Sequence, residues 1–264
     1  MLELKNITKI FNHGTINEKV ALDDISLRLE PGEFVTVIGG NGTGKSTMLN
    51  VIAGVFPVDS GRILLGDNDV TKTPEYQRAA FIGRVFQDPM MGTAADMEIE
   101  ENLALARRRG QRRGLRWEIS AKERAEYREQ LATLGLGLED RLRSKVGLLS
   151  GGQRQALTLM MATLKKPLLL LLDEHTAALD PKTAVTVLDA TEQIVSREKL
   201  TTVMITHNMK DAIAHGNRLI MMYDGRIVID VSGKDKQNLT VETLLQMFNT
   251  VSKTDEAIDR LILA

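Results

Sequence analysis

The segment from Gly39 to Ser46 constrains this chain most, because it reads G-G-N-G-T-G-K-S and fits the pattern G-x-x-x-x-G-K-[ST]. An apolar run, Phe34–Ile38, precedes it, and a helical pattern over Thr47–Ala53 follows it and stops at Gly54. A strand, a glycine-rich loop and a helix in this order direct backbone N–H groups and a helix N-terminus into one concavity, which suits a phosphate. The segment therefore predicts an α/β fold that binds a nucleoside triphosphate.

Two acidic residues follow an apolar strand further along the chain. Residues Leu168–Leu172 are five consecutive leucines, and Asp173 and Glu174 come directly after them. A continuous apolar run is typical of a parallel strand covered on both faces, and ligands of open α/β folds bind at the carboxyl ends of such strands. The pattern therefore predicts two carboxylates exposed at the edge of the sheet where a ligand would bind.

The pentapeptide L-S-G-G-Q at Leu149–Gln153 narrows the prediction to one superfamily. Together with the glycine-rich loop (the P-loop) and the two acids, it resembles the ATP-binding cassette (ABC) ATPases from about Leu2 to Gly233. The resemblance implies an α/β fold: a P-loop NTPase (RecA-like) core with an N-terminal antiparallel β subdomain and an inserted α-helical subdomain. The implied single ATPase domain spans 1–264, with its core in 1–88 and 164–233, the helical subdomain in 89–163 and a short helical tail in 234–264.

The resemblance also assigns each motif a role in binding and hydrolysing ATP with Mg²⁺. Lys45 would contact the β- and γ-phosphates, and Glu174 would be the catalytic base. His207, after the apolar run Thr202–Thr206, and Gln87 would act at the γ-phosphate and the attacking water. The implied metal ligands are Ser46, Gln87 and Asp173. The implied nucleotide-binding residues are Phe11, Gly39, Gly40, Asn41, Gly42, Thr43, Gly44, Lys45, Ser46, Thr47, Ser150, Gly151, Gly152, Gln153 and Asp180.

Three features allow more than one interpretation. Phe11, at the end of the first predicted strand, could stack on adenine or pack inside the N-terminal hairpin. His175 stands where the superfamily usually has proline, but the retained segment Thr176–Asp180 leads us to expect hydrolysis to survive. The run Arg107–Arg116 holds six arginines and precedes Trp117. It could meet lipid head groups or an acidic patch on a membrane protein, or it could be a solvated basic loop.

Composition excludes several classes of protein. The chain has no cysteine, which removes disulfides and thiolate metal sites, and its formal net charge of -1 gives no general attraction to nucleic acid. Hydrophobic residues make up 43% and charged residues 26%, as in globular proteins, and no stretch approaches the ~20 apolar residues of a membrane helix. Composition therefore predicts a cytosolic protein without a nucleic-acid partner, and the resemblance to ABC ATPases implies that it is peripheral, at the cytoplasmic face of the cell membrane.

The resemblance implies partners as well. Two copies would form a homodimer, with each ATP held between the P-loop of one copy and the Ser150 motif of the other. The absence of a fused membrane segment favours an importer-type complex with separate integral-membrane permease subunits and an extracytoplasmic substrate-binding protein. The loop Gly14–Lys19 and the tail Val241–Phe248 look like ATPases paired with branched-chain-type permeases, which suggests an amino acid as cargo. The alternative is a soluble accessory ABC ATPase, for example of the iron–sulfur assembly type.

Overall fold

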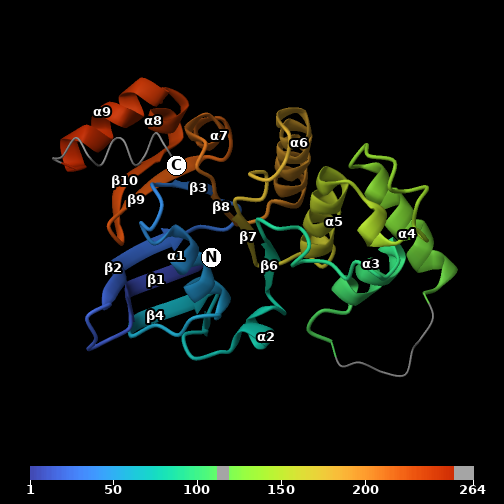
Figure 1. Cartoon of the computed structure of the whole chain (residues 1–264), viewed down its shortest axis with the longest axis horizontal. Helices are drawn as coiled ribbons and strands as arrows, with labels where there is room; N and C mark the ends of the chain where they lie inside the picture. The colour runs from blue at the N-terminus through green and yellow to red at the C-terminus, as the bar shows by residue number, and fades with distance from the viewer. Residues whose placement is uncertain (112–118, 253–264) are drawn as a thin grey trace. The chain divides into compact units, whose positions relative to one another are not determined.

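The computed structural model describes residues 1–111 and 119–252, and these form two compact units. The first unit comprises Met1–Arg78 and the chain from Lys199 onward, and the second comprises Ala79–Glu198. Figure 1 colours the start of the first unit blue and its end red, and most of the second unit green to yellow. The last part of the predicted helical tail, 253–264, lies outside the described residues, and the subdomain limits expected from the sequence stay predictions.

An antiparallel sheet forms the N-terminal part of the first unit. Its strands lie in the order β2-β1-β4-β5, and the predicted N-terminal hairpin is confirmed as the antiparallel pair β1–β2. Alternating apolar residues such as Leu2, Leu4 and Leu22 turn inward and are buried, as one-sided antiparallel sheets require. The strands are β1 Leu2–Phe11, β2 Lys19–Leu29, β4 Ser60–Leu65 and β5 Asn68–Asp69.

A mixed sheet forms the rest of the first unit. Strand β3 (Phe34–Ile38) runs parallel to β8 (Thr202–Ile205) on one side and to β9 (Arg218–Tyr223) on the other, and β10 (Arg226–Ser232) pairs antiparallel with β9. Leu244 and Phe248 are fully buried against this sheet, and the Tyr223 ring meets Phe248 edge-on at 5.4 Å. The helices of this unit are α1 Lys45–Ala53, α2 Glu75–Arg78, α7 Met209–Ala214, α8 Gly233–Gln237 and α9 Val241–Ser252.

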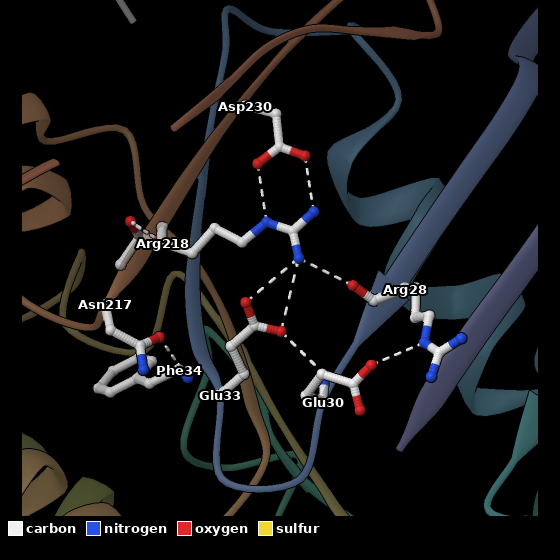
Figure 2. Close-up of polar contacts among 8 residues, drawn as sticks. Arg28, Glu30, Glu33, Phe34, Asn217, Arg218 and Asp230 are labelled. Carbon is white, nitrogen blue, oxygen red and sulfur yellow. Dashed lines mark hydrogen bonds and ion pairs between the residues drawn. The ribbon is translucent and has the colours of Figure 1, made fainter. Parts of the chain in front are cut away.

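An ion-pair cluster around Arg218 ties the two sheets of the first unit together (Figure 2). The Arg218 guanidinium donates from Nε (2.7 Å) and Nη2 (2.6 Å) to the two carboxylate oxygens of Asp230. Its Nη1 donates to Glu33 and to the backbone oxygen of Arg28 at 2.8 Å, where β2 ends. These partners raise the pKa of Arg218, with the Asp230 hydrogen bond as the largest cause. Beside the cluster, Asn217 accepts the backbone N–H of Phe34 at 3.0 Å, which fixes the start of β3.

The second unit combines a parallel strand pair with a group of helices. Strand β6 (Ile82–Val85) pairs in parallel with β7 (Leu169–Asp173). A Cβ added to Gly83 would lie 2.6 Å from the Ala162 backbone oxygen, so only glycine allows α5 to lie this close to β6. The remaining elements are α3 Ile99–Arg107, α4 Ala121–Ala132, a short 3-10 helix Val146–Leu148, α5 Gly151–Thr163 and α6 Pro181–Glu198.

Charged residues join the helices of the second unit. Glu100 of α3 is almost fully buried and accepts two hydrogen bonds from the Arg124 guanidinium of α4, at 2.8 and 3.0 Å. Tyr127 and Leu131 of α4 are also fully buried. A bidentate pair of this kind fixes the orientation of one helix against the other. Within the described part of the chain, every helix is too short or too polar to cross a bilayer.

Candidate active site

The P-loop has a backbone path that only glycine permits at two points. Gly39 has φ 150°, and a Cβ there would lie 2.3 Å from the backbone oxygen of Met222. Gly44 has φ 100°, and a Cβ there would lie 2.4 Å from the backbone oxygen of Ala21. The neighbouring strands therefore press against the loop on two sides, which holds it in one curve.

Lys45 is almost fully buried and its ammonium group binds the loop itself. Its Nζ donates to the backbone oxygens of Gly39 (2.7 Å) and Gly40 (2.9 Å), and the Thr43 hydroxyl also donates to Gly40 at 2.9 Å. Helix α1 begins at Lys45 without a side-chain cap, so its N-terminal end offers backbone N–H groups to an anion. Of the other predicted loop residues, Asn41, Gly42 and Ser46 are exposed and Thr47 is half-buried.

Phe11 shows features of both interpretations that the sequence allows. Its ring packs edge-on against Phe56 at 5.3 Å between centroids, and the Lys9 ammonium lies 5.5 Å from its centroid. The residue remains half-buried, so part of the ring is accessible to a stacking partner. The ring thus contributes to packing and keeps a surface on which a base could lie.

His207 lies at the same edge of the mixed sheet as the P-loop. Strand β8 ends at Ile205, which is in register with Val37 of the parallel strand β3, so His207 and Gly39 follow neighbouring strand ends. His207 is exposed, and Asn208 caps the following helix α7 by accepting the backbone N–H groups of Lys210 and Asp211. The first unit therefore brings one predicted catalytic residue beside the predicted phosphate site.

The predicted acidic residues and Gln87 share one strand edge in the second unit. Val85 of β6 is in register with Leu172 of β7, so Gln87 lies at the same edge as Asp173 and Glu174. Asp173 and Glu174 are half-buried, Gln87 is exposed, and the backbone of Glu174 has φ 45°. A guanidinium nitrogen of Arg84 lies 3.6 Å from Asp173, which offsets part of the carboxylate charge.

The Ser150 motif forms the N-terminus of α5, whose first residue is Gly151. Ser150 is the N-cap: its hydroxyl accepts the Gln153 N–H at 3.3 Å, and the Gln153 side chain accepts the Ser150 N–H at 3.2 Å. Gln153 also donates to the backbone oxygen of Leu136 at 3.2 Å. Ser150 and Gly151 remain exposed, whereas Gly152 is buried where a Cβ would lie 1.9 Å from Thr183 of α6. The side chain of Gln153 thus helps to cap the N-terminus of α5. The part of the motif that remains exposed is Ser150 and Gly151.

Asp180 lies just before α6 and accepts the backbone N–H of Thr183 at 3.1 Å. Hydrogen bonds from the Thr183 side chain and backbone lower the pKa of this exposed carboxyl. Asp180 therefore has the interactions of a helix N-cap, whatever further partner it meets.

Comparison with known proteins decides the family. A family model described as "ABC transporter" matches residues 22–177. A tyrosine transport ATP-binding protein of Clostridioides difficile (strain R20291) is 45% identical over 248 residues, which cover 94% of this chain and 98% of that protein. The chain belongs to the ABC transporter family. It is an ABC-type ATP-binding subunit whose ATPase activity is coupled to transport, as the motifs predict.

Other ABC proteins agree on the fold. The methionine import ATP-binding protein MetN of Corynebacterium efficiens is 35% identical over 232 residues, but this chain covers only 61% of its length. The dimeric structure of the bacterial ABC transporter cassette MJ0796 superimposes with a TM-score of 0.74 at 29% identity, covering 88% of this chain and 98% of that one. The ADP conformation of the cassette MJ1267 gives 0.77 at 25% identity, covering 99% and 98%. The predicted ABC ATPase fold is confirmed.

His175, the departure from the usual ABC sequence, is a buried residue of the second unit. It is 2% exposed, and its Nε2 lies 3.1 Å from the Thr191 hydroxyl on α6. That hydroxyl also donates to the backbone oxygen of Val187 at 2.7 Å. The imidazole thus attaches the segment after Glu174 to α6, a contact that the sequence does not predict.

Half of the basic run in this ABC ATPase is engaged within its own unit. Arg107 pairs with Glu126 and Arg108 with Glu123, both on α4. Arg109 donates to the backbone oxygens of Ala162 (3.2 Å) and Lys165 (3.4 Å) near the end of α5, and burial lowers its pKa. These arginines therefore hold helices together. Arg112, Arg113, Arg116 and Trp117 lie outside the described residues, so their predicted contact with lipid or a permease stays a prediction.

Two residues that support the site were missed in the sequence. Gln155 of α5 is fully buried and donates to the backbone oxygen of Phe86 at 3.0 Å, which fixes the chain next to Gln87. Arg78, 2% exposed, donates to backbone oxygens at the end of α1, the helix that follows the P-loop. The sequence offers no signal for either residue, because both act on backbone oxygens of segments that are distant in the chain.

Proposed function

We propose that this ABC ATPase powers the import of an amino acid, with tyrosine or a related aromatic amino acid as the first candidate. The observation that carries the cargo assignment is the 45% identity to a tyrosine transport ATP-binding protein over nearly the full length of both chains. The methionine and spermidine/putrescine relatives are named as import proteins, which supports the direction of transport. Because an ATPase subunit does not bind the cargo, the assignment rests on similarity and requires a transport assay.

The nucleotide lies along the P-loop in this proposal. The adenine stacks on the accessible part of the Phe11 ring, and the phosphates occupy the curve from Gly39 to Thr47. Lys45 exchanges its bonds to the loop carbonyls for bonds to the β- and γ-phosphates, since an ammonium prefers an anionic acceptor over a neutral one. His207, beside the loop, contacts the γ-phosphate. This arrangement places the positive charge where charge accumulates during phosphoryl transfer.

Glu174 orients and deprotonates the attacking water, with Gln87 at the same strand edge as its helper. The oxygen donors Ser46, Gln87 and Asp173 suit Mg²⁺, which prefers oxygen ligands and usually keeps few protein ligands beside phosphates and water. No group of three or more His, Asp or Glu side chains gathers as a metal cage in residues 1–111 and 119–252, which fits such a site. A bound Mg²⁺ would offset the phosphate charge, while these side chains would position the water and the γ-phosphate.

The functional unit we propose is a homodimer attached to membrane proteins. Ser150 and Gly151, the exposed face of their motif, would close on the nucleotide bound to the partner copy, because a helix N-terminus favours phosphate. Similarity to a dimeric cassette supports this arrangement. The remaining partners are integral-membrane permease subunits of the branched-chain type and an extracytoplasmic substrate-binding protein. The ATPase would then be peripheral, at the cytoplasmic face of the membrane.

Exposed apolar side chains of the second unit support a membrane partner. Met90, Met91 and Leu148 are 45%, 70% and 71% exposed. Arg154 contacts the Met90 sulfur and donates to the backbone oxygen of Gly147, the residue before Leu148, at 3.1 Å. Exposed apolar groups gathered in this way are typical of protein contact surfaces.

Uptake of radiolabelled tyrosine tests the proposal in cells that lack the chromosomal copy of this gene. The native chain should restore uptake, and Lys45→Ala should not, although it should reach the membrane in equal amount. Purification of the chain from detergent-solubilised membranes, followed by mass spectrometry, should recover a polytopic permease. Recovery of soluble partners alone would replace the transporter with an accessory ATPase. Restored uptake of another amino acid, but not of tyrosine, would overturn the cargo only.

A further inference from the structure

The beginning of β2 lies directly on the P-loop. The backbone oxygen of Ala21 approaches Gly44, as described above, and the next contact along the loop comes from Lys19. A Cβ placed on Gly42 would lie 3.3 Å from the Nζ of Lys19. Gly42 is one of the exposed residues of the loop, so the Lys19 ammonium lies over the part that a nucleotide would cover.

Lys19 is also the partner of Phe11 in the antiparallel sheet. The two residues are directly opposite each other at the end of the β1–β2 pair. Side chains of directly paired residues project from the same face of a sheet. The Lys19 stem therefore starts beside the Phe11 ring and ends at the P-loop, so it spans the two parts of the proposed nucleotide site.

The Lys19 ammonium has no carboxylate partner within residues 1–111 and 119–252. The adjacent Glu18 carboxylate turns elsewhere: it accepts the Gly14 N–H at 2.6 Å and lies 3.3 Å from the His13 ring. Lys19 itself is exposed. A cation without an anionic neighbour, held over a loop built for phosphate, can take a phosphate oxygen without first breaking an ion pair.

We propose that Lys19 is a further nucleotide-binding residue, which contacts the phosphate chain between the adenine and the phosphates bound by Lys45. This inference rests on the proposed ATP site. It differs from the roles assigned to the P-loop because Lys19 lies on β2, outside every nucleotide motif of the sequence. Since Lys19 reaches the loop from the Phe11 side, its ligand is the α- or β-phosphate. The contact should therefore strengthen the binding of ADP as well as that of ATP.

Calorimetric titration of the purified full chain with ADP tests the assignment. Lys19→Gln should weaken ADP binding about tenfold, the loss expected for one charge-assisted hydrogen bond, and Lys19→Arg should retain most of the affinity. The affinity of Lys19→Gln should also depend less on ionic strength. Lys5→Gln is the matched control, because Lys5 is an exposed lysine of the same sheet that pairs with Glu3 at 3.1 Å. It should bind ADP as the native chain does.

The outcomes separate this inference from the proposed function. ADP binding by Lys19→Gln within about twofold of the native affinity would overturn the role of Lys19. An equal loss in Lys5→Gln would also overturn it, since the effect would then come from overall charge. If the native chain bound no nucleotide, both the proposed site and the role of Lys19 would fail. If Lys45→Ala lost binding while Lys19→Gln kept it, only the role of Lys19 would fail.

Discussion

Replacing Arg78 by methionine should destabilise the helix that follows the P-loop. The Arg78 guanidinium is buried and donates to four backbone oxygens: Thr73 (2.7 Å), Val51 and Ile52 (2.8 Å each) and Thr71 (3.0 Å). Val51 and Ile52 belong to the last turn of α1, whose carbonyl groups have no partner within the helix. Arg78 therefore caps α1 and binds it to the segment that leads into α2.

The size of the effect follows from these bonds and from the cost of burying the cation. Each hydrogen bond from a charged donor contributes about 1.5–3 kcal/mol, which gives a gross stabilisation of about 6–12 kcal/mol. Burial of a guanidinium offsets several kcal/mol of this sum, consistent with the pKa of Arg78, which burial lowers. After the substitution, the backbone oxygen of Val51 still accepts the Gly54 N–H, at 3.2 Å. We expect a net loss of about 3 kcal/mol for Arg78→Met, which retains most of the side-chain volume.

Amide hydrogen exchange measured by mass spectrometry is the suitable assay. Peptides from α1 should exchange faster in Arg78→Met, whereas Arg62→Met, a change of an exposed arginine on β4, should leave the exchange unchanged. If Arg78→Met lost less than about 1 kcal/mol of protection in α1, the four hydrogen bonds would not be capping the helix as we argue.

Three further predictions concern other parts of the molecule. Glu174→Gln should abolish ATP hydrolysis and leave a stable ATP-bound dimer in gel filtration; ordinary turnover would remove Glu174 as the base. Arg218→Met should lower the free energy of unfolding by about 2 kcal/mol, because it leaves Asp230 and Glu33 without their shared cation. Chemical denaturation of the native chain, Arg218→Met and Asp230→Asn would measure this loss. Burial raises the pKa of Asp211 although two nearby histidines oppose it. The protonated Asp211 carboxyl therefore contributes to stability at low pH, and this contribution is lost as pH rises through the raised pKa of the folded protein. Asparagine does not ionise, so the free energy of unfolding of Asp211→Asn should rise relative to that of the native chain between acid and neutral pH. Equal pH profiles would contradict this.

Local patterns predicted the elements that carry the P-loop. The apolar run Phe34–Ile38 becomes β3 with the expected bounds, because a strand buried on both faces has a continuous apolar sequence. The helix after the loop ends at Gly54, which adopts φ 85° at the C-cap, as glycine allows. Such features depend on residues close together in the chain, and a single sequence therefore reveals them.

The contacts that support these elements join distant segments and could not be predicted. Arg78 reads as an ordinary charged residue of a short helix, yet its hydrogen-bond partners include the backbone oxygens of Val51 and Ile52, which lie 27 and 26 residues earlier in the chain. Backbone oxygens carry no sequence signature, so no pattern marks the residue that will bind them. The sequence places Lys19 in the loop Gly14–Lys19 and does not reveal its contact with the P-loop. Its approach to Gly42 depends on the strand register, which the sequence leaves open.

The geometry after β7 explains how this chain does without the usual proline. Glu174 has φ 45°, a conformation that costs a non-glycine residue about 1 kcal/mol or more and persists only if its neighbours hold it. On one side, the buried leucines of β7 fix the chain. On the other, proline would restrict the backbone through its ring, whereas His175 restricts it through burial and the contact with Thr191. A proline acts on its own residue and on the residue before it, but the imidazole attaches the backbone to α6. In this chain the orientation of the proposed base therefore depends on α6, and Thr191 belongs to its support as much as His175 does.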